Sequence, residues 1–339
     1  MSKILNSLAY GAIGDAMGAA TENLSFNQIR KKFNGKVQEF LKPDEANFAL
    51  GNEAGQVTDD FSQTYLLCRK ILENNGVINE KIVKLAILEW SDMPQYFDRF
   101  AGPTTRSAVK MFKTGAKELE KAPGAVTVDY SSKATNGSAM KISPAGLFNP
   151  GNPNKAIEDA ITITRVTHDN HLAISGACAV ASAISTGLKE NSNIDDIIKS
   201  GIEGSMIGEE KGILVSREVG GASVTERIKL AIKIASQSKD KDSIMKDLYD
   251  IIGSGLHVSE AVPISFGILK ANENNPFEAV IDAVNIGYDT DTVAIITGTM
   301  AGSICYEIND KIENMIDILE EKNKMGIREL AREIEKINL

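Results

Sequence analysis

The chain has 339 residues with 46 acidic and 37 basic side chains, and its formal net charge is −9. Hydrophobic residues make up 42% of it and charged residues 24%, a composition typical of globular and not of disordered proteins. The acidic balance argues against nucleic acid as the main partner, because few spare cations would neutralise a phosphate backbone.

Cysteine usage and the absence of long apolar runs indicate the compartment. The three cysteines Cys68, Cys178 and Cys305 are odd in number, widely spaced and set among apolar residues, which predicts reduced core thiols and no disulfide framework. No run of 18 apolar residues could span a membrane. The N-terminus also lacks the apolar stretch and cleavage site of a secretory signal. We expect a soluble, cytoplasmic protein that does not bind a membrane.

The hydrophobic periodicity is helical along most of the chain. Residues 61–74 place Phe61, Tyr65, Leu66, Ile71 and Leu72 on roughly one face, which is the pattern of an amphipathic helix. The same pattern predicts further helices at 77–90, 155–166, 171–188, 223–236, 241–252, 276–286 and 290–306. Residues 306–339 predict a solvated amphipathic helix or a pair of helices. With no clear period-two strand, the sequence predicts an all-α fold.

Two long stretches, 24–57 and 121–153, have no strong periodic pattern. Irregular stretches of this length inside a compact domain are usually binding or lid loops. No Ser/Gly-rich tether divides the chain, so we expect a single domain over residues 1–339.

The first of three acidic clusters is Gly11-Ala12-Ile13-Gly14-Asp15-Ala16-Met17-Gly18, with Glu22 four residues on. Gly11, Gly14 and Gly18 share one helical face, which lets another backbone approach closely. Each glycine costs about 1 kcal/mol in a helix interior relative to alanine. The three glycines therefore indicate a packing or site requirement, the simpler interpretation being tight helix packing with Asp15 at the surface.

The other two clusters lie where helices are predicted to begin. Thr58-Asp59-Asp60 precedes the helix at Phe61, so an N-cap and helix-dipole role explains these residue types by itself. In Asp289-Thr290-Asp291-Thr292 the first residues could also cap a helix. Two carboxylates and a hydroxyl on one short turn would equally suit a hard divalent cation. The sixth-position glycine and distal glutamate of an EF-hand are absent, which argues against a calcium sensor.

In this order and at these separations, the three clusters resemble the ADP-ribosylglycohydrolase family. The family begins with a Gly-Asp-Ala-Leu-Gly type helix and a following Glu, here Glu22. It then carries Thr-Asp-Asp-Thr and ends with Gly-Gly-Asp-Thr-Asp-Thr before a small-residue helix. Further landmarks that look like the family are Gly102-Pro103-Thr104-Thr105-Arg106, Asn136-Gly137-Ser138-Ala139-Met140-Lys141, Thr167-His168 and Ser259-Glu260-Ala261-Val262-Pro263. The resemblance spans roughly residues 4 to 306.

The resemblance implies one compact, orthogonal multi-helix bundle with a metal-containing cleft that holds two divalent cations, Mg²⁺ or Mn²⁺. The positions that match the family's metal ligands are Thr58, Asp59, Asp60, Asp289, Asp291 and Thr292. Oxygen ligands agree with these hard cations. With Glu22, the cleft would hold about five negative charges, and two divalent cations would offset roughly four of them.

The resemblance also suggests roles in catalysis and substrate binding. We expect Asp60 to orient or deprotonate a water held with the ribose hydroxyls at the metals, and Glu22 to control access or assist. The positions expected to contact substrate are Gly102, Thr104, Thr105, Asn136, Gly137, Ser138, His168 and Tyr288. Arg106 could add positive charge there, or serve only the structure.

The predicted activity is metal-dependent hydrolysis of the ribosyl anomeric bond in ADP-ribosylated protein or a related ADP-ribose compound. Two departures from the family pattern bear on the substrate. Phe61 stands where the family usually has threonine, and Tyr288 stands where it has glycine. A small nucleoside or ribosyl substrate is therefore an alternative. A second alternative is a non-catalytic, ADP-ribose-binding homologue.

Two further features have simpler interpretations. His168 and His171 have a spacing that can chelate a metal on a helix, but no third nitrogen or sulfur ligand lies nearby in the sequence. We interpret them as a cap or a surface pair, with His168 orienting a loop. Trp90 is expected in the core.

Overall fold

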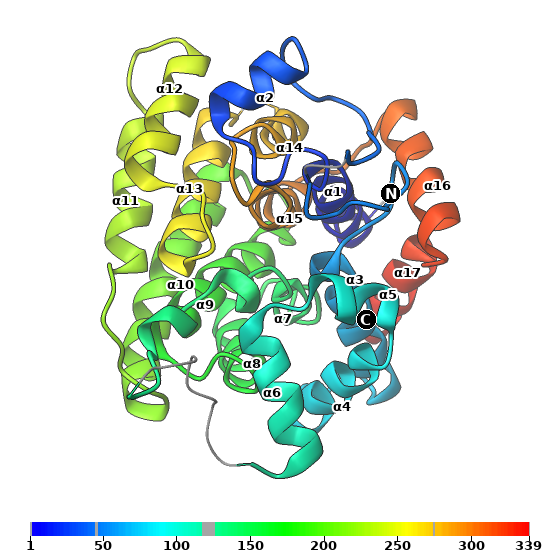
Figure 1. Ribbon diagram of the computed structural model, residues 1–339, viewed down its shortest axis with the longest axis vertical. Coiled ribbons are helices and arrows are strands. Elements are labelled where there is room, and N and C mark those ends of the chain that lie inside the picture. Colours follow the sequence, from blue (N-terminus) through cyan, green and yellow to red (C-terminus); the bar gives the residue numbers. More distant parts are fainter. Residues whose placement is uncertain (1, 45–46, 117–125, 274, 339) are drawn as a thin grey trace.

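The computed structural model describes residues 2–44, 47–116, 126–273 and 275–338 (Figure 1). Every regular element in these residues is helical, and β structure is confined to two isolated bridges, Thr135–His257 and Asn170–Arg217. The predicted all-α fold is confirmed.

The α-helices are α1 (Lys3–Gly18), α2 (Phe26–Lys32), α3 (Asp59–Glu73), α4 (Glu80–Ser91), α5 (Pro94–Phe100), α6 (Pro103–Thr114), α7 (Ser143–Leu147), α8 (Pro153–Arg165), α9 (His171–Gly187), α10 (Ile194–Val215), α11 (Val224–Ala235), α12 (Lys241–Asp247), α13 (Val258–Ala271), α14 (Pro276–Val284), α15 (Thr290–Gly302), α16 (Asp310–Asn323) and α17 (Ile327–Asn338). Short 3₁₀ turns form η1 (Ser131–Lys133) and η2 (Asn136–Ser138), and a π-helical turn, η3 (Leu248–Ile252), extends α12.

The eight helices predicted from periodicity correspond to α3, α4, α8, α9, α11, α12 with η3, α14 and α15. The C-terminal region is a pair of helices, α16 and α17. The prediction that the helix from residue 290 reaches residue 306 was wrong, because α15 ends at Gly302. There the Asn6 side chain donates a hydrogen bond to the Cys305 carbonyl (2.8 Å) and helps hold the chain in a non-helical path.

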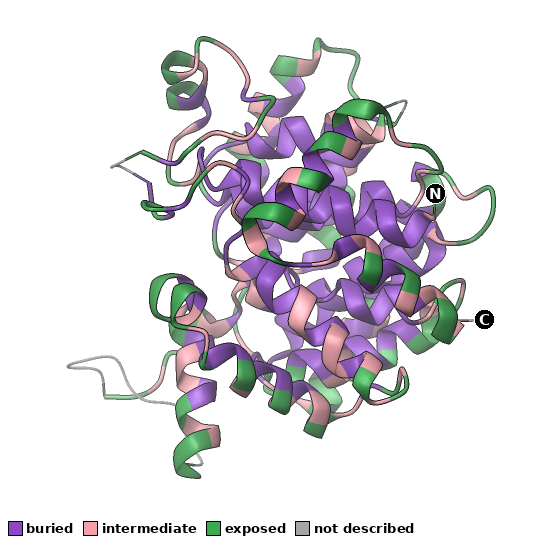
Figure 2. Cartoon of the chain, turned by 90° about the vertical axis from the view of Figure 1, so that its right-hand side faces the viewer, coloured by how far each residue is buried: buried purple, intermediate pink, exposed green. Residues whose placement is uncertain are grey.

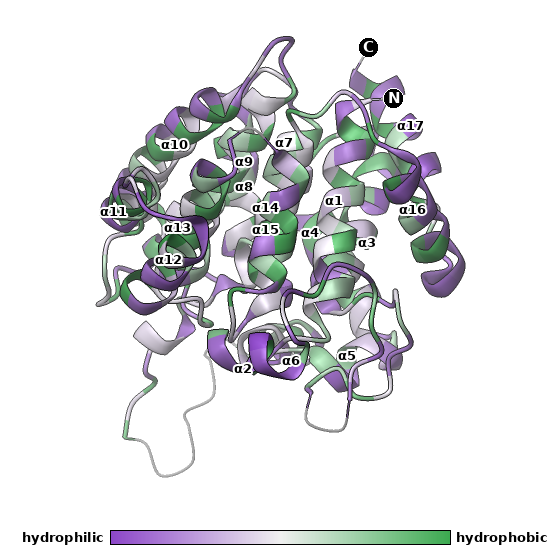
Figure 3. Ribbon diagram, turned by 90° about the horizontal axis from the view of Figure 1, so that it is seen from above, coloured by the Kyte–Doolittle hydropathy of each residue, from purple (hydrophilic) through white to green (hydrophobic). Residues whose placement is uncertain are grey.

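The interior is formed by α1, α14 and α15, which lie in the centre of the molecule with α10–α13 on one side and α16 and α17 on the other (Figure 3). All residues of α1 and α15 are buried. Figure 2 shows the same arrangement, with buried ribbon in the middle and exposed residues on the outer helices. The helices that are hydrophobic all round are thus the central ones.

Contact between α1 and α15 depends on the glycines of the first cluster. A Cβ on Gly14 would lie 2.5 Å from the Ala294 carbonyl oxygen, and one on Gly18 would lie 2.4 Å from the Asp291 Cα. The tight packing interpretation is therefore correct for these glycines. Its assumption that Asp15 lies at the surface was wrong, because Asp15 is fully buried.

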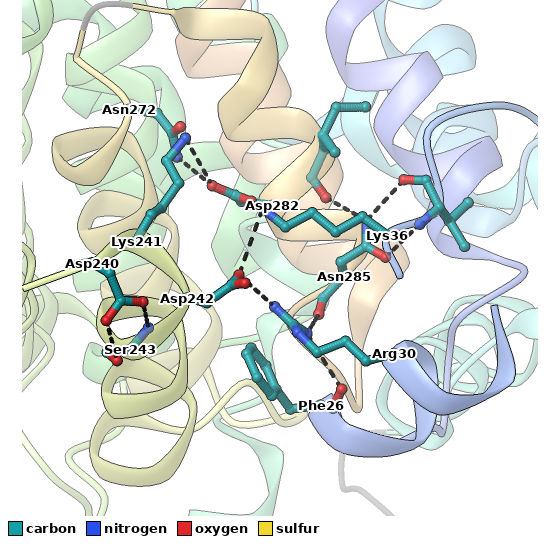
Figure 4. Close-up of polar contacts among 12 residues, drawn as sticks. Phe26, Arg30, Lys36, Asp240, Lys241, Asp242, Ser243, Asn272, Asp282 and Asn285 are labelled. Atoms are coloured by element: carbon teal, nitrogen blue, oxygen red, sulfur yellow. Dashed lines mark hydrogen bonds and ion pairs between the residues drawn. The ribbon is translucent and has the colours of Figure 1, made fainter. Parts of the chain in front are cut away.

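The segment after α1 is fastened to α14 by a polar network (Figure 4). The buried Asp282 carboxylate accepts hydrogen bonds from Lys36 (2.6 Å) and Asn272 (2.9 Å) and pairs with Lys241 (3.5 Å). The Asn285 side chain exchanges two hydrogen bonds, each 2.8 Å, with the backbone of Val37. These contacts fix the residues that follow α2, and the Arg30 guanidinium of α2 itself donates to the Asn285 carbonyl (3.2 Å). The segment after α1 is thereby held against the end of α14, shortly before Asp289.

Other expectations about the core are also met. The Trp90 side chain is buried, and its indole N–H donates to the Ser62 hydroxyl (3.0 Å). Cys68 and Cys178 are buried free thiols, and Cys305 is free and half-buried. No helix in the described ranges is long and apolar enough to cross a membrane.

Candidate active site

The three acidic clusters converge on one cavity of about 290 Å³. Five carboxylates line it, contributed by Glu22 after α1, Asp59 and Asp60 at the start of α3, and Asp289 and Asp291 at the start of α15. Segments separated by more than 200 residues are therefore brought together, because α1 packs against both α3 and α15.

Asp15 sets the beginning of α3. Its carboxylate accepts hydrogen bonds from the Thr58 N–H (3.1 Å to each oxygen), the Thr58 hydroxyl (2.7 Å) and the Phe61 N–H (3.0 Å). Two N–H groups at this helix end are thus satisfied from α1. Thr58 is also the N-cap, as expected, and accepts from the Asp60 N–H (3.4 Å). The positions of Asp59 and Asp60 therefore depend on a carboxylate outside the cavity.

The start of α15 is held from two sides. The Asn136 side chain donates to Asp289 Oδ2 (2.5 Å), and Asp291 Oδ1 accepts from the Thr292 N–H (2.9 Å). The Asn23 N–H donates to the Tyr288 carbonyl (2.7 Å), and the Tyr288 N–H donates to the Leu24 carbonyl (2.8 Å). These two backbone hydrogen bonds join the Glu22 segment to the Asp289 loop.

The cavity contains an oxygen cluster suited to a cation. One carboxylate oxygen each from Glu22, Asp289 and Asp291 lie within 4.8 Å of one another. Glu22 Oε2 and Asp60 Oδ2 are buried and have no hydrogen-bond partner among the described residues. Buried carboxylate oxygens normally have partners, so these two are free to bind a hard cation, whose preferred ligands are oxygen atoms. The donor set therefore fits a divalent metal ion.

Crowding of carboxylates in a buried place raises their pKa values. Burial, then the charges of Asp291 and Asp289, raise the pKa of Glu22 to about 11. Burial, followed by neighbouring carboxylates, raises the pKa of Asp59 and that of Asp291 to about 7. Burial also raises the pKa of Asp60 well above its usual range, with the charge of Asp291 as the next cause. Bound cations would relieve this repulsion.

Lys141 is the cation that faces this cluster from inside the protein. Its side chain is fully buried, and its Nζ donates to the Gly137 carbonyl (2.6 Å). Burial lowers the pKa of Lys141 to about 8, and the charges of Asp59 and Asp60 act in the opposite direction. Lys141 therefore both fixes the η2 turn and places positive charge behind the carboxylates.

Most of the positions that the sequence suggested do line this cavity. They are Glu22, Asp59, Asp60, Gly102, Thr104, Thr105, Asn136, Gly137, His168, Tyr288, Asp289, Asp291 and Thr292. Two do not. Thr58 is turned toward Asp15, and the buried Ser138 hydroxyl donates to the Ala173 carbonyl (3.4 Å). Their hydroxyl groups are thus used by the fold.

The two departures from the family pattern have different consequences. Phe61 is fully buried in the hydrophobic core and does not line the cavity. Tyr288 lines it, is 45% exposed and has a positive φ of 64°, a conformation that a residue with a Cβ seldom adopts. Its ring packs over Gly255, where a Cβ would lie 2.6 Å from the Tyr288 ring. Only Tyr288 changes the shape of the cavity.

Hydrogen bonds define the role of Arg106. Arg106 does not reach the cavity, because its guanidinium donates to the carbonyls of Ala101, Phe97 and Asp98 (2.8–2.9 Å) at the end of α5. The prediction that Arg106 adds positive charge to the cavity was wrong, and the alternative prediction of a structural role is correct.

His168 and His171 are both buried, so their interpretation as a surface pair was wrong. The two ring nitrogens of His168 hydrogen-bond the hydroxyls of Thr135 (2.9 Å) and Thr167 (2.8 Å). His171 Nδ1 accepts from the Val219 N–H (3.2 Å). His168 therefore orients the loop around Thr135, in agreement with the expected loop-orienting role.

The two stretches without a periodic pattern are not wholly irregular, because α2 lies in the first and η1, η2 and α7 lie in the second. Both contribute to the cavity wall, as expected for binding segments. Phe48 comes from the first stretch, and Thr135, Asn136, Gly137 and Met140 come from the second. Residues 45–46 and 121–125 of these stretches lie outside the described residues. Backbone contact with substrate through residues 136–140 is limited, because the Asn136, Ala139 and Met140 N–H groups are already bonded within the protein.

Sequence reasoning missed several contributors. Asp15 on α1 and Lys141 in the turn after η2 belong to the sequence motifs, but their burial becomes evident only when the elements that pack against them are known. Phe48, Phe100 and Leu256 contribute apolar surface to the cavity wall. Phe48 and Leu256 are 55% exposed, and nothing in their local sequence distinguishes them.

Comparison with known proteins agrees with this geometry. A sequence model of the ADP-ribosylglycohydrolase family matches residues 1–337. The chain is 29% identical to the uncharacterized protein YegU of Escherichia coli (strain K12), over 89% of this chain and 86% of that protein. It is 22% identical to the ADP-ribosylhydrolase ARH3 of Homo sapiens, over 89% and 85% of the two chains.

The fold is also found among solved structures. A structure described as an ADP-ribosylglycohydrolase-related protein complex matches with a TM-score of 0.68 at 18% identity, covering 100% of this chain and 98% of that chain. At this identity the match speaks for the fold alone. Since the family pattern extends over almost the whole sequence, the chain belongs to the ADP-ribosylglycohydrolase family, a family of glycosidic hydrolases.

Proposed function

We propose that this protein uses divalent cations, Mg²⁺ or Mn²⁺, to hydrolyse the ribosyl anomeric bond of an ADP-ribosylated protein or related ADP-ribose compound. The observation that carries the proposal is the meeting of five carboxylates in one cavity, with buried, unpartnered oxygens on Glu22 and Asp60. Burying this much negative charge without a cation would be strongly unfavourable.

Asp59 and Asp60 would hold one cation and Asp289, Asp291 and the Thr292 hydroxyl the other, with Glu22 beside the second group. Thr58, which matches a family ligand position, would instead support Asp59 and Asp60 as the N-cap of α3. The metal ions would supply Lewis acidity, orient the substrate and lower the pKa of a water.

The protein's own groups would then position the reactants. Asp60 Oδ2 is free to accept a proton from water or to orient it, as a general base requires. Glu22 lies beside Asp289 and Asp291, where it would control access to the second cation or assist catalysis. A carboxylate-rich wall also favours the positive charge that develops on the ribosyl ring as the leaving group departs.

The substrate end of the cavity has features that fit a ribosyl compound. Gly137 lines the wall, and because it has no side chain its backbone is what it presents to a ligand. Gly102, the N-cap of α6, and Thr104 in its first turn also line the cavity. Tyr288 presents an aromatic face at the mouth, where it can contact a base or the leaving group.

The test is to incubate the purified protein with ADP-ribosyl-arginine, O-acetyl-ADP-ribose and a panel of nucleosides, each with Mg²⁺, Mn²⁺ or EDTA. Products are followed by chromatography. Metal-dependent release of ADP-ribose, lost in Asp60→Asn and Asp291→Asn, is the expected result. Asp195→Asn, an exposed aspartate on α10, is the matched control and should retain activity.

Other outcomes separate the alternatives. Release of a free base would identify a nucleoside hydrolase on the same fold. Metal-dependent binding of ADP-ribose without turnover of any of these substrates would contradict the hydrolase proposal for them and favour a binding protein.

A further inference from the structure

A second cavity of about 470 Å³ adjoins the acidic one, and Thr104 and His168 line both. It is bounded by α4, α6, η1 and the turn before α9. No position expected from the sequence to contact substrate lies in it except the two shared residues. Its size is within the range of ligand pockets, roughly 300–1,000 Å³.

The charge of this second cavity is opposite to that of the first. Its lining includes the cationic side chains Lys84, Lys133, Arg165 and Arg217 and two carboxylates, Glu80 and Asp169, which leaves a formal charge of +2. Arg165 is paired with Asp169 (3.0 Å). Lys84, Lys133 and Arg217 form no ion pair with any residue that the structure describes. In a chain with a net charge of −9, three cations without an ion pair around one cavity form a local positive field that attracts an anion.

The cations are held by the fold. The Arg217 guanidinium lies 3.6 Å from the centroid of the Tyr130 ring, a stacking arrangement that fixes its plane. Its backbone carbonyl accepts from the His171 N–H (3.0 Å). The buried Asn170 side chain caps α9 and donates to the Lys133 carbonyl (3.3 Å). One buried turn therefore fixes the backbone of both Lys133 and Arg217, and the stacked Arg217 guanidinium has less entropy to lose on binding an anion.

The wall between the two cavities is rigid. His168 is held through both ring nitrogens by Thr135 and Thr167. Burial lowers the pKa of His168 well below its usual range, and the charges of Lys141 and Lys133 act in the same direction. His168 is therefore a neutral ring that separates an acidic chamber from a basic one.

We propose that the basic chamber, lined by Lys84, Lys133 and Arg217, binds a phosphate group of the same ligand whose ribosyl group lies in the acidic cavity. The planar guanidinium of Arg217 suits bidentate contact with phosphate, and the two lysines add point charges. This inference rests on the proposed function. It deepens it by favouring a phosphorylated ribosyl substrate over a free nucleoside, which would leave these cations unpaired.

Binding measurements test the proposal directly. Calorimetry would compare ADP-ribose with adenosine, its phosphate-free counterpart, on the wild type, Arg217→Gln and Lys133→Gln. Each substitution should weaken ADP-ribose about tenfold, the effect of losing roughly 1.4 kcal/mol, and leave adenosine unchanged. The loss should shrink as ionic strength rises. The matched controls are Arg332→Gln on α17 and Lys199→Gln on α10, both exposed and remote.

The phosphate could be the diphosphate itself or a terminal phosphate monoester, and one more probe distinguishes them. ADP-ribose carrying a 2′-phosphate should lose more affinity than ADP-ribose in Arg217→Gln if the chamber binds a terminal phosphate. Both should lose affinity equally if it binds the diphosphate. Each of these results supports an anion site.

Two results would overturn the inference. One is unchanged ADP-ribose affinity in both variants. The other is an equal loss for adenosine, which would mean that Lys133 and Arg217 serve only the structure. Because binding is measured without turnover, a wild type that binds ADP-ribose but hydrolyses nothing would reject the hydrolase proposal and leave the anion site standing.

Discussion

Two buried side chains, Asp15 and Lys141, support the acidic cavity without lining it. Asp15, on α1, accepts hydrogen bonds from the Thr58 and Phe61 N–H groups at the start of α3. Lys141 donates a hydrogen bond to the Gly137 carbonyl behind the carboxylates. A buried charged group normally costs stability unless it is hydrogen-bonded and compensated. Asp15 and Lys141 are both hydrogen-bonded. Through these bonds Asp15 positions the start of α3, and Lys141 positions the η2 turn.

Replacing Asp15 with asparagine should damage the metal site from outside it. An amide offers one acceptor oxygen, so its NH₂ would face one of the N–H donors that Asp15 now satisfies. We expect a loss of about 1–3 kcal/mol in the free energy of unfolding and a metal affinity reduced at least tenfold. Thermal denaturation and metal titration would check this. An Asp15→Asn protein with the metal affinity of the Asp195→Asn control would show that Asp15 does not position α3.

The Lys141→Met substitution should separate the effect of the Lys141 charge and hydrogen bond from the effect of its side-chain volume. Methionine has similar length but cannot donate to the Gly137 carbonyl, so the η2 turn that places Asn136 against Asp289 should loosen. We expect kcat to fall about tenfold with a smaller change in KM, and Lys141→Arg to restore most of it because it keeps the donor and the charge. Steady-state kinetics would measure the split. Equal activity of the methionine and arginine variants would contradict this role.

At the residue scale, the sequence predicted the carboxylates of the cavity but not what holds them. Asp59, Asp60, Asp289 and Asp291 stand at helix starts, where turn chemistry and motif order mark them. Asp15 was placed at the surface in the simpler interpretation, because a lone acidic residue in a helix is usually solvated. Its three partners lie 43 to 46 residues away, a separation that local pattern does not reveal.

At the scale of elements, the packing of α1 on α15 ties fold to site. Gly18 lies against the Asp291 backbone, whereas Gly11, one end of the same stripe, faces the Thr299 side chain. The two contacts differ in how easily the neighbouring atoms can move to make room for a new Cβ. A backbone at the start of α15 cannot move without moving Asp291, but a threonine methyl group can shift locally.

This difference predicts unequal effects for two matched substitutions. In Gly18→Ala the new Cβ would lie 2.4 Å from the Asp291 Cα, so we expect destabilisation of about 3 kcal/mol and loss of the metal-induced rise in Tm. In Gly11→Ala the gain in helix propensity, about 1 kcal/mol, offsets part of the clash, and the metal response should be kept. Both are read from melting curves with and without Mn²⁺. An intact metal response in a folded Gly18→Ala protein would refute the coupling.

Helices α10 and α13 were not predicted from the sequence, because each lacks a clear local helical pattern. Helix α10 carries Gly201, Gly204, Gly208 and Gly212 on its buried side, so beyond Ile198 its contact face lacks the large apolar residues that periodicity detects. A Cβ on Gly204 would lie 2.6 Å from the Cys178 carbonyl oxygen of α9. Helix α13 is buried nearly all round and contains Pro263, which reads as a helix breaker. Close packing partners override both local signals.

At the scale of the whole molecule, the fold gathers negative charge at its centre and keeps a basic chamber beside it. The five cavity carboxylates come from three segments that only the assembled bundle brings together. Folding without a cation therefore works against electrostatic repulsion, and the metal, if bound only by the folded state, should add stability by mass action. Metal dependence of stability is then a property of the whole chain, measurable without a substrate.

The pH dependence follows from the direction of the pKa shifts. Burial raises the pKa values of Asp59 and Asp291 to about 7 and that of Asp15 to about 6 in the folded, metal-free protein, against about 4 when unfolded. The folded state thus binds more protons, so this contribution to stability is full below about pH 4 and is lost as pH rises through 6 to 7.

We therefore expect the Tm of the protein in EDTA to fall between pH 5.5 and pH 8. With Mg²⁺ or Mn²⁺ in excess the fall should be reduced or reversed, because protons compete with the cation at low pH. At a metal concentration 100 times Kd the gain is about 2.7 kcal/mol, a shift of several degrees that should be largest near pH 8. Asp291→Asn removes one of the competing charges, so its Tm in EDTA should depend less on pH than that of the wild type. A metal-induced shift that is equal at both pH values would mean that the cations do not replace protons on these carboxylates.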